Sequence, residues 1–199
     1  MPAELLERAM RLFWQRGYYD TPIDALIADA GLNRSAIYRH FGSKREFFRA
    51  LLEHYRDTVS ARMLAPLRAE GADLAGVRTF FLRLRALAET EQSRRGCLMV
   101  MTGSEVSTRE RAIGKVVLAF LDTVRGLFAA ALDRALAAGQ LSARVESARL
   151  ADYLVGALVG FMTLARSPLP RASLVNYVNE LLAHLDGLAA VGQEPQRVS

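Results

Sequence analysis

The chain has 199 residues, of which 51% are hydrophobic, and this is enough apolar material for a buried core. Its 26 Lys and Arg residues against 21 Asp and Glu residues give a formal charge of +5, which favours nucleic acid or an anionic membrane surface as a partner. No apolar stretch reaches the roughly 18 residues of a membrane span, and the N-terminus lacks the order of a secretory signal, so we expect a cytoplasmic protein. A single cysteine, Cys97, excludes an intrachain disulfide and a thiolate metal cluster.

Apolar residues recur at spacings of three and four along nearly the whole chain, whereas strict alternation is scarce. This periodicity predicts an all-α fold of about nine helices. The expected ranges, in chain order, are 3–16, 22–30, 34–41, 43–66, 74–91, 97–103, 107–138, 145–165 and a last helix that follows Pro170 and ends near Leu188. We expect the tail, residues 192–199, to be disordered.

The second and third predicted helices are short and adjacent. Thr21 is the expected N-cap of the second helix, Pro22 suits its first position, and Asp24 completes a capping box. Gly31 breaks this helix, and Asn33 caps the next one. Two short helices joined by a three-residue turn that contains glycine predict a helix-turn-helix.

The helices that follow carry their own start signals. Ser43 and Glu46 form a second capping box at the start of a helix long enough to connect two domains. Ser142 is the expected cap of the helix over 145–165.

Residues 33–49 combine a basic surface with an apolar side. Only Glu46 opposes five cations, and Ile37 and Phe41, four residues apart, are left to face the core. The five cations are Arg34, Arg39, Lys44, Arg45 and Arg49. A second helix with these properties is what a helix-turn-helix needs to read DNA.

Residues 3–55, which include this segment, resemble the signature of the TetR/AcrR family of transcriptional regulators. The resemblance is carried by Ala9, Leu12-Phe13, Gly17-Tyr18, Thr21, Ile23, Ala30-Gly31-Leu32, Ile37-Tyr38, His40-Phe41 and Ser43-Lys44. It implies a homodimer with a DNA-binding domain over 1–56 and an effector-binding and dimerisation domain over 57–191. It also implies a repressor that binds a palindromic operator and responds to a ligand.

The family motif assigns DNA contacts residue by residue. Those that resemble phosphate-gripping positions are Thr21, Tyr38, His40 and Lys44. Those at the base-reading end of the recognition helix are Asn33, Arg34, Ser35, Ala36 and Arg39, although Arg39 could equally lie on the solvent side. We expect double-stranded operator DNA as the macromolecular partner.

The C-terminal half suggests a ligand cavity and a self-association surface. Aromatic, aliphatic and sulfur-containing side chains at helical spacing predict a cavity lined by Phe80, Phe81, Leu84, Leu87, Cys97, Met101, Phe120, Leu121, Val124 and Phe161. This list predicts a small hydrophobic or weakly polar effector. Apolar residues on more than one face of the last two helices predict a dimer interface made by Tyr153, Leu154, Ala157, Leu158, Leu174, Tyr177, Val178, Leu181 and Leu185.

Two other readings of the sequence remain open. Cys97 lies in Arg95-Gly96-Cys97-Leu98-Met99, which resembles a Gly-Cys-Leu element of one subset of the family, and it is either a buried core thiol or the centre of a thiol-based redox sensor. Alternatively, the protein is a DNA-binding module without an effector. With no phosphate-cradling loop, no nucleophile beside a base and no histidine pair at metal spacing, we expect no enzyme activity, no metal and no cofactor.

Overall fold

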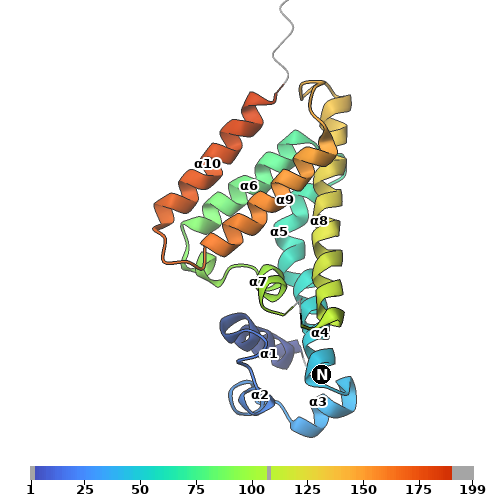
Figure 1. Ribbon diagram of the computed structural model, residues 1–199, viewed down its shortest axis with the longest axis vertical. Coiled ribbons are helices and arrows are strands. Elements are labelled where there is room, and N and C mark those ends of the chain that lie inside the picture. Colours follow the sequence, from blue (N-terminus) through green and yellow to red (C-terminus); the bar gives the residue numbers. More distant parts are fainter. Residues whose placement is uncertain (1–2, 107–108, 190–199) are drawn as a thin grey trace, which may run out of the picture.

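The computed structural model describes residues 3–106 and 109–189, and these form an all-α fold (Figure 1). The α-helices are α1 (Ala3–Arg16), α2 (Ile23–Ala30), α3 (Arg34–Phe41), α4 (Lys44–Tyr55), α5 (Ala61–Arg68), α6 (Leu74–Ala88), α7 (Leu98–Glu105), α8 (Arg111–Ala137), α9 (Ser147–Leu164) and α10 (Arg171–Gly187). A π-helical segment η1 (Arg56–Ser60) joins α4 to α5 without a break, and a 3-10 segment η2 (Glu91–Arg95) precedes α7. Taking α4, η1 and α5 as one rod, the described residues contain nine α-helical rods, which confirms the predicted fold.

The helices form two groups of unequal size. Helices α1, α2 and α3 pack at one end of the molecule around the start of α4, and α5, α6, α8, α9 and α10 form a larger bundle at the other end (Figure 1). Helix α7 lies between the groups and contacts both α4 and α8. The continuous α4–η1–α5 rod therefore belongs to both groups.

Local capping explains why the short helices end where they do. Gly31 adopts a left-handed conformation with φ of 69°, which stops α2. The Asn33 side chain accepts a hydrogen bond from the Ala36 N–H at 3.2 Å, and the Ser43 hydroxyl accepts one from the Glu46 N–H at 3.1 Å. Both side chains are the N-caps that the sequence predicted.

Several predicted helix starts need correction. Pro22, not Thr21, precedes α2 as its N-cap residue, because the Thr21 hydroxyl donates to the Gly17 carbonyl instead. Ser142 caps only a turn, and α9 begins at Ser147 after Glu146. Helix α8 begins at Arg111; residues 107–108 and the predicted tail 192–199 lie outside the described residues.

Each helical group contains a cluster of aromatic rings. Phe13, Phe47 and Phe48 are fully buried between α1 and α4, and the Phe13 and Phe48 rings lie 4.6 Å apart. Phe80 and Phe81 of α6 pack in the same way on Phe128 of α8 in the larger bundle. Both aromatic clusters belong to one continuous hydrophobic core, so the two helical groups are packed together.

Helix α9 is long and apolar enough to cross a membrane by length and composition alone. Seven of its residues are buried inside this chain, where α9 packs chiefly against α8. Its apolar composition is that of a core helix.

Candidate nucleic-acid interface and internal cavity

Helix α3 buries one residue and presents polar side chains on its other sides. Ile37 is fully buried, whereas Tyr38, Arg39 and His40 are exposed. Tyr38 is a large aromatic residue with 45% of its surface exposed, which is unusual for a side chain that serves only packing. Its hydroxyl is free to donate to a phosphate oxygen.

The N-terminal end of α3 is also exposed. Asn33, Arg34 and Ser35 are exposed, and Ala36 is half-buried. The Asn33 amide oxygen is engaged as the cap of α3, and the Arg34 guanidinium forms an ion pair with Asp24 of α2. Because a guanidinium has five N–H donors, the ion pair with Asp24 leaves donors of Arg34 for a further acceptor.

Lys44 lies at the junction between α3 and α4, beside the Tyr18 turn. Its ammonium donates to the Tyr18 carbonyl at 2.6 Å and lies 4.4 Å from the centroid of the Tyr18 ring. Partial burial lowers the pKa of Lys44 below its ordinary value, against the opposing effect of the Glu105 and Asp20 carboxylates. The ammonium has three donors, so two remain for an anion outside the protein.

Thr21 does not lie on this surface. Its side chain is fully buried, and its hydroxyl donates to the Gly17 carbonyl at 2.6 Å. The prediction that its side chain grips a phosphate is therefore wrong, because the hydroxyl closes the turn between α1 and α2.

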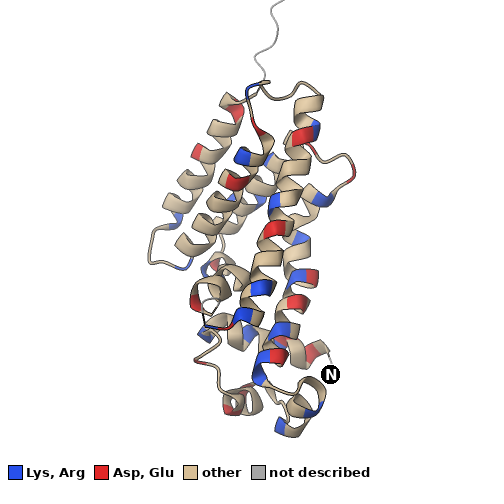
Figure 2. Ribbon diagram, turned by 45° about the vertical axis from the view of Figure 1, so that its right-hand side comes forward, with Lys and Arg blue, Asp and Glu red and all other residues tan. Residues whose placement is uncertain are grey.

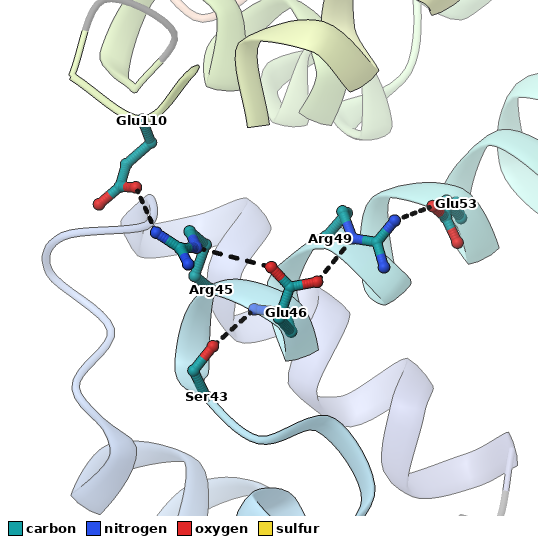
Figure 3. A network of polar contacts seen from close by, with 6 residues as sticks. All are labelled: Ser43, Arg45, Glu46, Arg49, Glu53 and Glu110. Atoms are coloured by element: carbon teal, nitrogen blue, oxygen red, sulfur yellow. Dashed lines mark hydrogen bonds and ion pairs between the residues drawn. The ribbon is translucent and has the colours of Figure 1, made fainter. Parts of the chain in front are cut away.

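An ion-pair network connects α4 to the start of α8 (Figure 3). Glu46 accepts from Arg49 at 2.9 Å and lies 3.5 Å from Arg45, so its carboxylate serves ion pairs, and only the Ser43 half of the predicted capping box forms. Arg45 also reaches Glu110, which precedes α8, at 3.7 Å. Both Arg45 and Arg49 thus pair with carboxylates, whereas Arg39 on α3 has no carboxylate partner in the described ranges 3–106 and 109–189.

Charge alone does not single out the helix-turn-helix. Basic residues occur at the α3 end of the molecule, but basic and acidic residues also follow one another along the long helices (Figure 2). The assignment of this surface to DNA therefore depends on the exposed polar face of α3 and on the family motif.

A cavity of about 410 Å³ lies where α1, the α4–η1–α5 rod, α6 and α7 meet. This volume is within the range of small-molecule sites. Four of the predicted cavity residues line it, namely Phe80, Leu87, Cys97 and Phe120. The other six do not, and these are Phe81, Leu84, Met101, Leu121, Val124 and Phe161.

Packing within the bundle explains four of these six errors. Phe81, Leu84, Val124 and Phe161 are fully or almost fully buried in the core of the chain, where neighbouring helices fill the space around them. The sequence pattern marks them as apolar but cannot separate a wall of a cavity from filled core.

Sequence reasoning missed most of the remaining wall. The missed residues are Trp14, Tyr55, Val59, Ser60, Arg62, Met63, Leu64, Arg83, Gln92, Arg95, Gly96, Val100, Leu158 and Met162. One signal available in the sequence was the single tryptophan of the chain, which directly follows Phe13. The π-helical segment η1, which contributes Val59 and Ser60 to the wall, is seen only in the structure, and such segments occur often at functional sites.

Trp14 connects the cavity to the helix-turn-helix group. Its indole N–H donates to the Arg95 carbonyl at 2.8 Å, and its ring meets the Tyr55 ring edge-on at 5.1 Å. Arg166 of the bend after α9 donates to the carbonyls of both Trp14 and Arg95. A helix of the α1–α3 group therefore forms part of the cavity wall.

Cys97 lines the same cavity and is 7% exposed. The Tyr55 hydroxyl donates to its sulfur at 3.5 Å. Burial raises the pKa of the Cys97 thiol above its ordinary value, which keeps the less reactive thiol form at neutral pH. This environment favours the core thiol over the redox sensor.

The predicted dimer residues also require correction. Seven of the nine are buried within the chain itself, namely Leu154, Ala157, Leu158, Leu174, Val178, Leu181 and Leu185. Tyr177 is half-buried and donates to the Ala157 carbonyl at 3.0 Å, whereas Tyr153 is 49% exposed and packs edge-on against His184. The apolar stripes of α9 and α10 therefore face this chain's own core, and the outward faces of these helices carry other residues.

Both helical groups match models of known protein families. Residues 5–51 match the family model described as bacterial regulatory proteins, tetR family, and residues 74–176 match the tetracyclin repressor-like C-terminal domain. The chain is 25% identical over 162 residues to the HTH-type transcriptional repressor ComR of Escherichia coli, across 81% of this chain and 77% of ComR. It is 28% identical over 150 residues to the transcriptional regulator AcuR of Cereibacter sphaeroides, across 74% of this chain and 68% of AcuR.

Solved structures show the same fold. A cysteine-substituted form of the TetR family regulator CifR in complex with 26-base-pair operator DNA has a TM-score of 0.79 and 28% identity, across 90% of this chain and 94% of CifR. The family and these relatives are transcriptional regulators and not enzymes. The chain belongs to the TetR family of bacterial regulatory proteins and is a DNA-binding transcriptional regulator.

Proposed function

We propose that this regulator is a repressor that binds a palindromic operator as a homodimer and leaves it when a small molecule occupies the cavity. Residues 1–56 act as the DNA-binding domain, and residues 57–191 act as the effector-binding and dimerisation domain. A protein of this kind works in the cytoplasm, where its operator is. The similarity to ComR, which is named a transcriptional repressor, supports repression over activation.

The DNA contacts that we propose divide into two classes. Tyr38, His40 and Lys44 hold phosphates, and Asn33, Arg34, Ser35, Ala36 and Arg39 face base edges in the major groove. The exposure of α3 on the side away from Ile37 supports this division. Two copies of α3 would enter successive major grooves about 34–36 Å apart.

We place the dimer interface on the outward faces of α9 and α10. Tyr153 and His184 form an exposed aromatic pair there. Gly156 is exposed in the middle of α9, and a Cβ at this position would meet nothing within 4 Å. Glycine inside a helix costs about 1 kcal/mol relative to alanine, and the close approach of a partner helix is a reason to keep it.

The observation that carries the effector proposal is the place of Trp14. This residue belongs to α1 of the DNA-binding domain, yet it lines the cavity and bonds to the Arg95 carbonyl of the effector domain. A ligand that displaces this wall changes the position of α1. An effector that prefers the displaced state by roughly 1–3 kcal/mol changes operator affinity about 5-fold to 150-fold.

Selection of bound sequences from randomised duplex DNA at two salt concentrations tests the operator part. Phosphate attraction weakens steeply with salt, whereas base readout sets the consensus. A palindromic consensus with two equal half-sites is the expected result. Binding without any consensus would indicate a nonspecific DNA-coating protein instead.

The alternative of a DNA-binding module without an effector predicts a filled C-terminal core. A cavity of about 410 Å³ with a largely apolar wall argues against it. A ligand library screened by thermal shift separates the two, because only an effector-binding protein gains stability from a cavity ligand.

A further inference from the structure

The wall of the cavity changes character between its buried and its exposed parts. The buried and half-buried lining residues are mostly apolar or aromatic, such as Leu64, Phe80 and Phe120. The exposed lining residues are Arg62, Arg83, Gln92 and Arg95, all of them polar and three of them arginine. The lining includes no Asp or Glu.

These three arginines have no carboxylate partner among the described residues. This is not the rule for nearby cations, because Arg78 on the same helix as Arg83 pairs with Asp186, and Arg171 pairs with Glu91 of η2. Three exposed arginines thus line one cavity without a carboxylate partner in the described part of the chain.

The arginines are also placed by their surroundings. Arg83 donates to the Arg62 carbonyl at 3.1 Å, which draws its guanidinium toward α5. The backbone of Arg95 is fixed by the hydrogen bonds that its carbonyl accepts from Trp14 and Arg166. Guanidinium groups match carboxylate and phosphate oxygens with paired N–H donors.

We propose that the cavity binds an organic anion whose apolar body lies among the buried side chains and whose single anionic head group meets Arg62, Arg83 and Arg95. This inference rests on the proposed effector site and names the chemical class of the ligand. It adds an anionic group to the hydrophobic effector that composition alone predicted. A neutral or cationic molecule of the same shape leaves the three charges unmatched.

Trp14 supplies a direct test, because it is the only tryptophan of the chain and lines the cavity. Its fluorescence is titrated with octanoate, 1-octanol and octyltrimethylammonium, and with 4-phenylbutanoate and 4-phenylbutanol as an aromatic pair. We expect the anions to bind at least about tenfold more tightly than their alcohols, and added salt to reduce only the anion affinities. The cation is expected to bind most weakly.

Arginine variants test whether the three arginines cause the preference for anions. The R62Q/R83Q/R95Q variant should lose the anion preference while it keeps its affinity for the alcohols. R144Q is the control, since Arg144 is an exposed arginine that has no carboxylate partner among the described residues and lies outside the cavity wall. The single variant R83Q and the salt titration of the unchanged protein decide the question if the triple variant does not fold.

Equal or tighter binding of the alcohols, an anion preference that survives in the triple variant, or no change in Trp14 emission with any probe would overturn the ligand class. Operator binding measured in parallel tests the effector proposal separately. Release of DNA by a neutral compound would retain the effector function and reject the anion. Anion binding without release of DNA would retain the ligand class and reject the effector function.

Discussion

The carboxylate of Glu105, the last residue of α7, accepts a hydrogen bond from the backbone N–H of Tyr18 at 3.0 Å. Its second oxygen accepts from the Tyr19 N–H at 2.9 Å. Gly17 makes room for this contact, because a Cβ there would lie 2.6 Å from Oε2 of Glu105, and its φ of 87° already favours glycine. Glu105 of α7 thus holds the turn between α1 and α2.

Helix α7 therefore touches both functional regions. Cys97 and Val100, at its start, line the cavity, and Glu105, at its end, holds the turn that carries Tyr18. The Tyr18 carbonyl in turn accepts from Lys44. We propose that α7, a short helix engaged at both ends, is the connection through which a ligand biases the DNA-binding helices.

Replacement Glu105→Ala should uncouple the two domains. Two backbone N–H groups lose a charged acceptor, so we expect the free energy of unfolding in urea to fall by about 1–3 kcal/mol. The ratio of operator affinities without and with ligand should also move toward one. Glu89→Ala is the control, since Glu89 is exposed and its side chain has no ion pair in the described part of the chain; equal coupling in both variants would exclude Glu105 from the connection.

The two classes of DNA contact should respond differently to substitution. Tyr38→Ala and Lys44→Ala should weaken binding to all sequences, and the loss of Lys44 should lower the slope of log affinity against log salt by about one. Arg34→Ala should instead relax the preference at particular base pairs by about 1–3 kcal/mol. Competition binding with single-base operator variants at several salt concentrations measures both, and unchanged affinity in all three variants would reject the assignment.

The outward face of α9 can be tested with two matched glycines. Gly156→Glu should dissociate the dimer, because it puts a charge and bulk into the proposed interface, and operator affinity should fall with it. Gly126→Glu in α8 is the control, since Gly126 is likewise an exposed helical glycine with nothing within 4 Å of a Cβ. Analytical ultracentrifugation reports the oligomeric state, and a Gly156→Glu protein that stays dimeric would place the interface elsewhere.

Cys97 should behave as a core residue. Its pKa is raised by burial, so at about pH 8 its thiolate fraction is below that of a free thiol, whose pKa is about 8.5. We expect slow labelling by iodoacetamide in the folded protein and fast labelling in urea. Cys97→Ser should leave the response of operator binding to oxidant unchanged, and an oxidant response that disappears in this variant would revive the redox sensor.

Local features of the fold were predictable because their causes lie within a few residues. Asn33 caps α3, Ser43 caps α4 and Gly31 stops α2, as their types and spacing indicate. Thr21 was assigned wrongly, since its hydroxyl could reach either the start of α2 or the Gly17 carbonyl four residues back. Single-residue chemistry does not decide whether the hydroxyl accepts from an N–H group at the start of α2 or donates to the Gly17 carbonyl.

Features that depend on distant helices were less predictable. The apolar stripe of α9 indicates burial, but the pattern is the same whether Leu154 faces its own chain or a partner. The cavity likewise arises from helices more than 80 residues apart, as the bond from Trp14 to Arg95 shows. Helical periodicity identifies the apolar faces, whereas the space between them depends on tertiary packing.

The most direct test of coupling between the cavity and the DNA surface is a reciprocal binding measurement with the unchanged protein. Operator affinity is measured by fluorescence anisotropy without and with saturating octanoate, and octanoate affinity is measured by Trp14 emission without and with operator. If cavity and DNA surface are coupled, both affinities change by the same factor, about 5-fold to 150-fold, as linkage requires. Octanoate that binds beside Trp14 and leaves operator affinity unchanged would contradict the coupling between cavity and DNA surface.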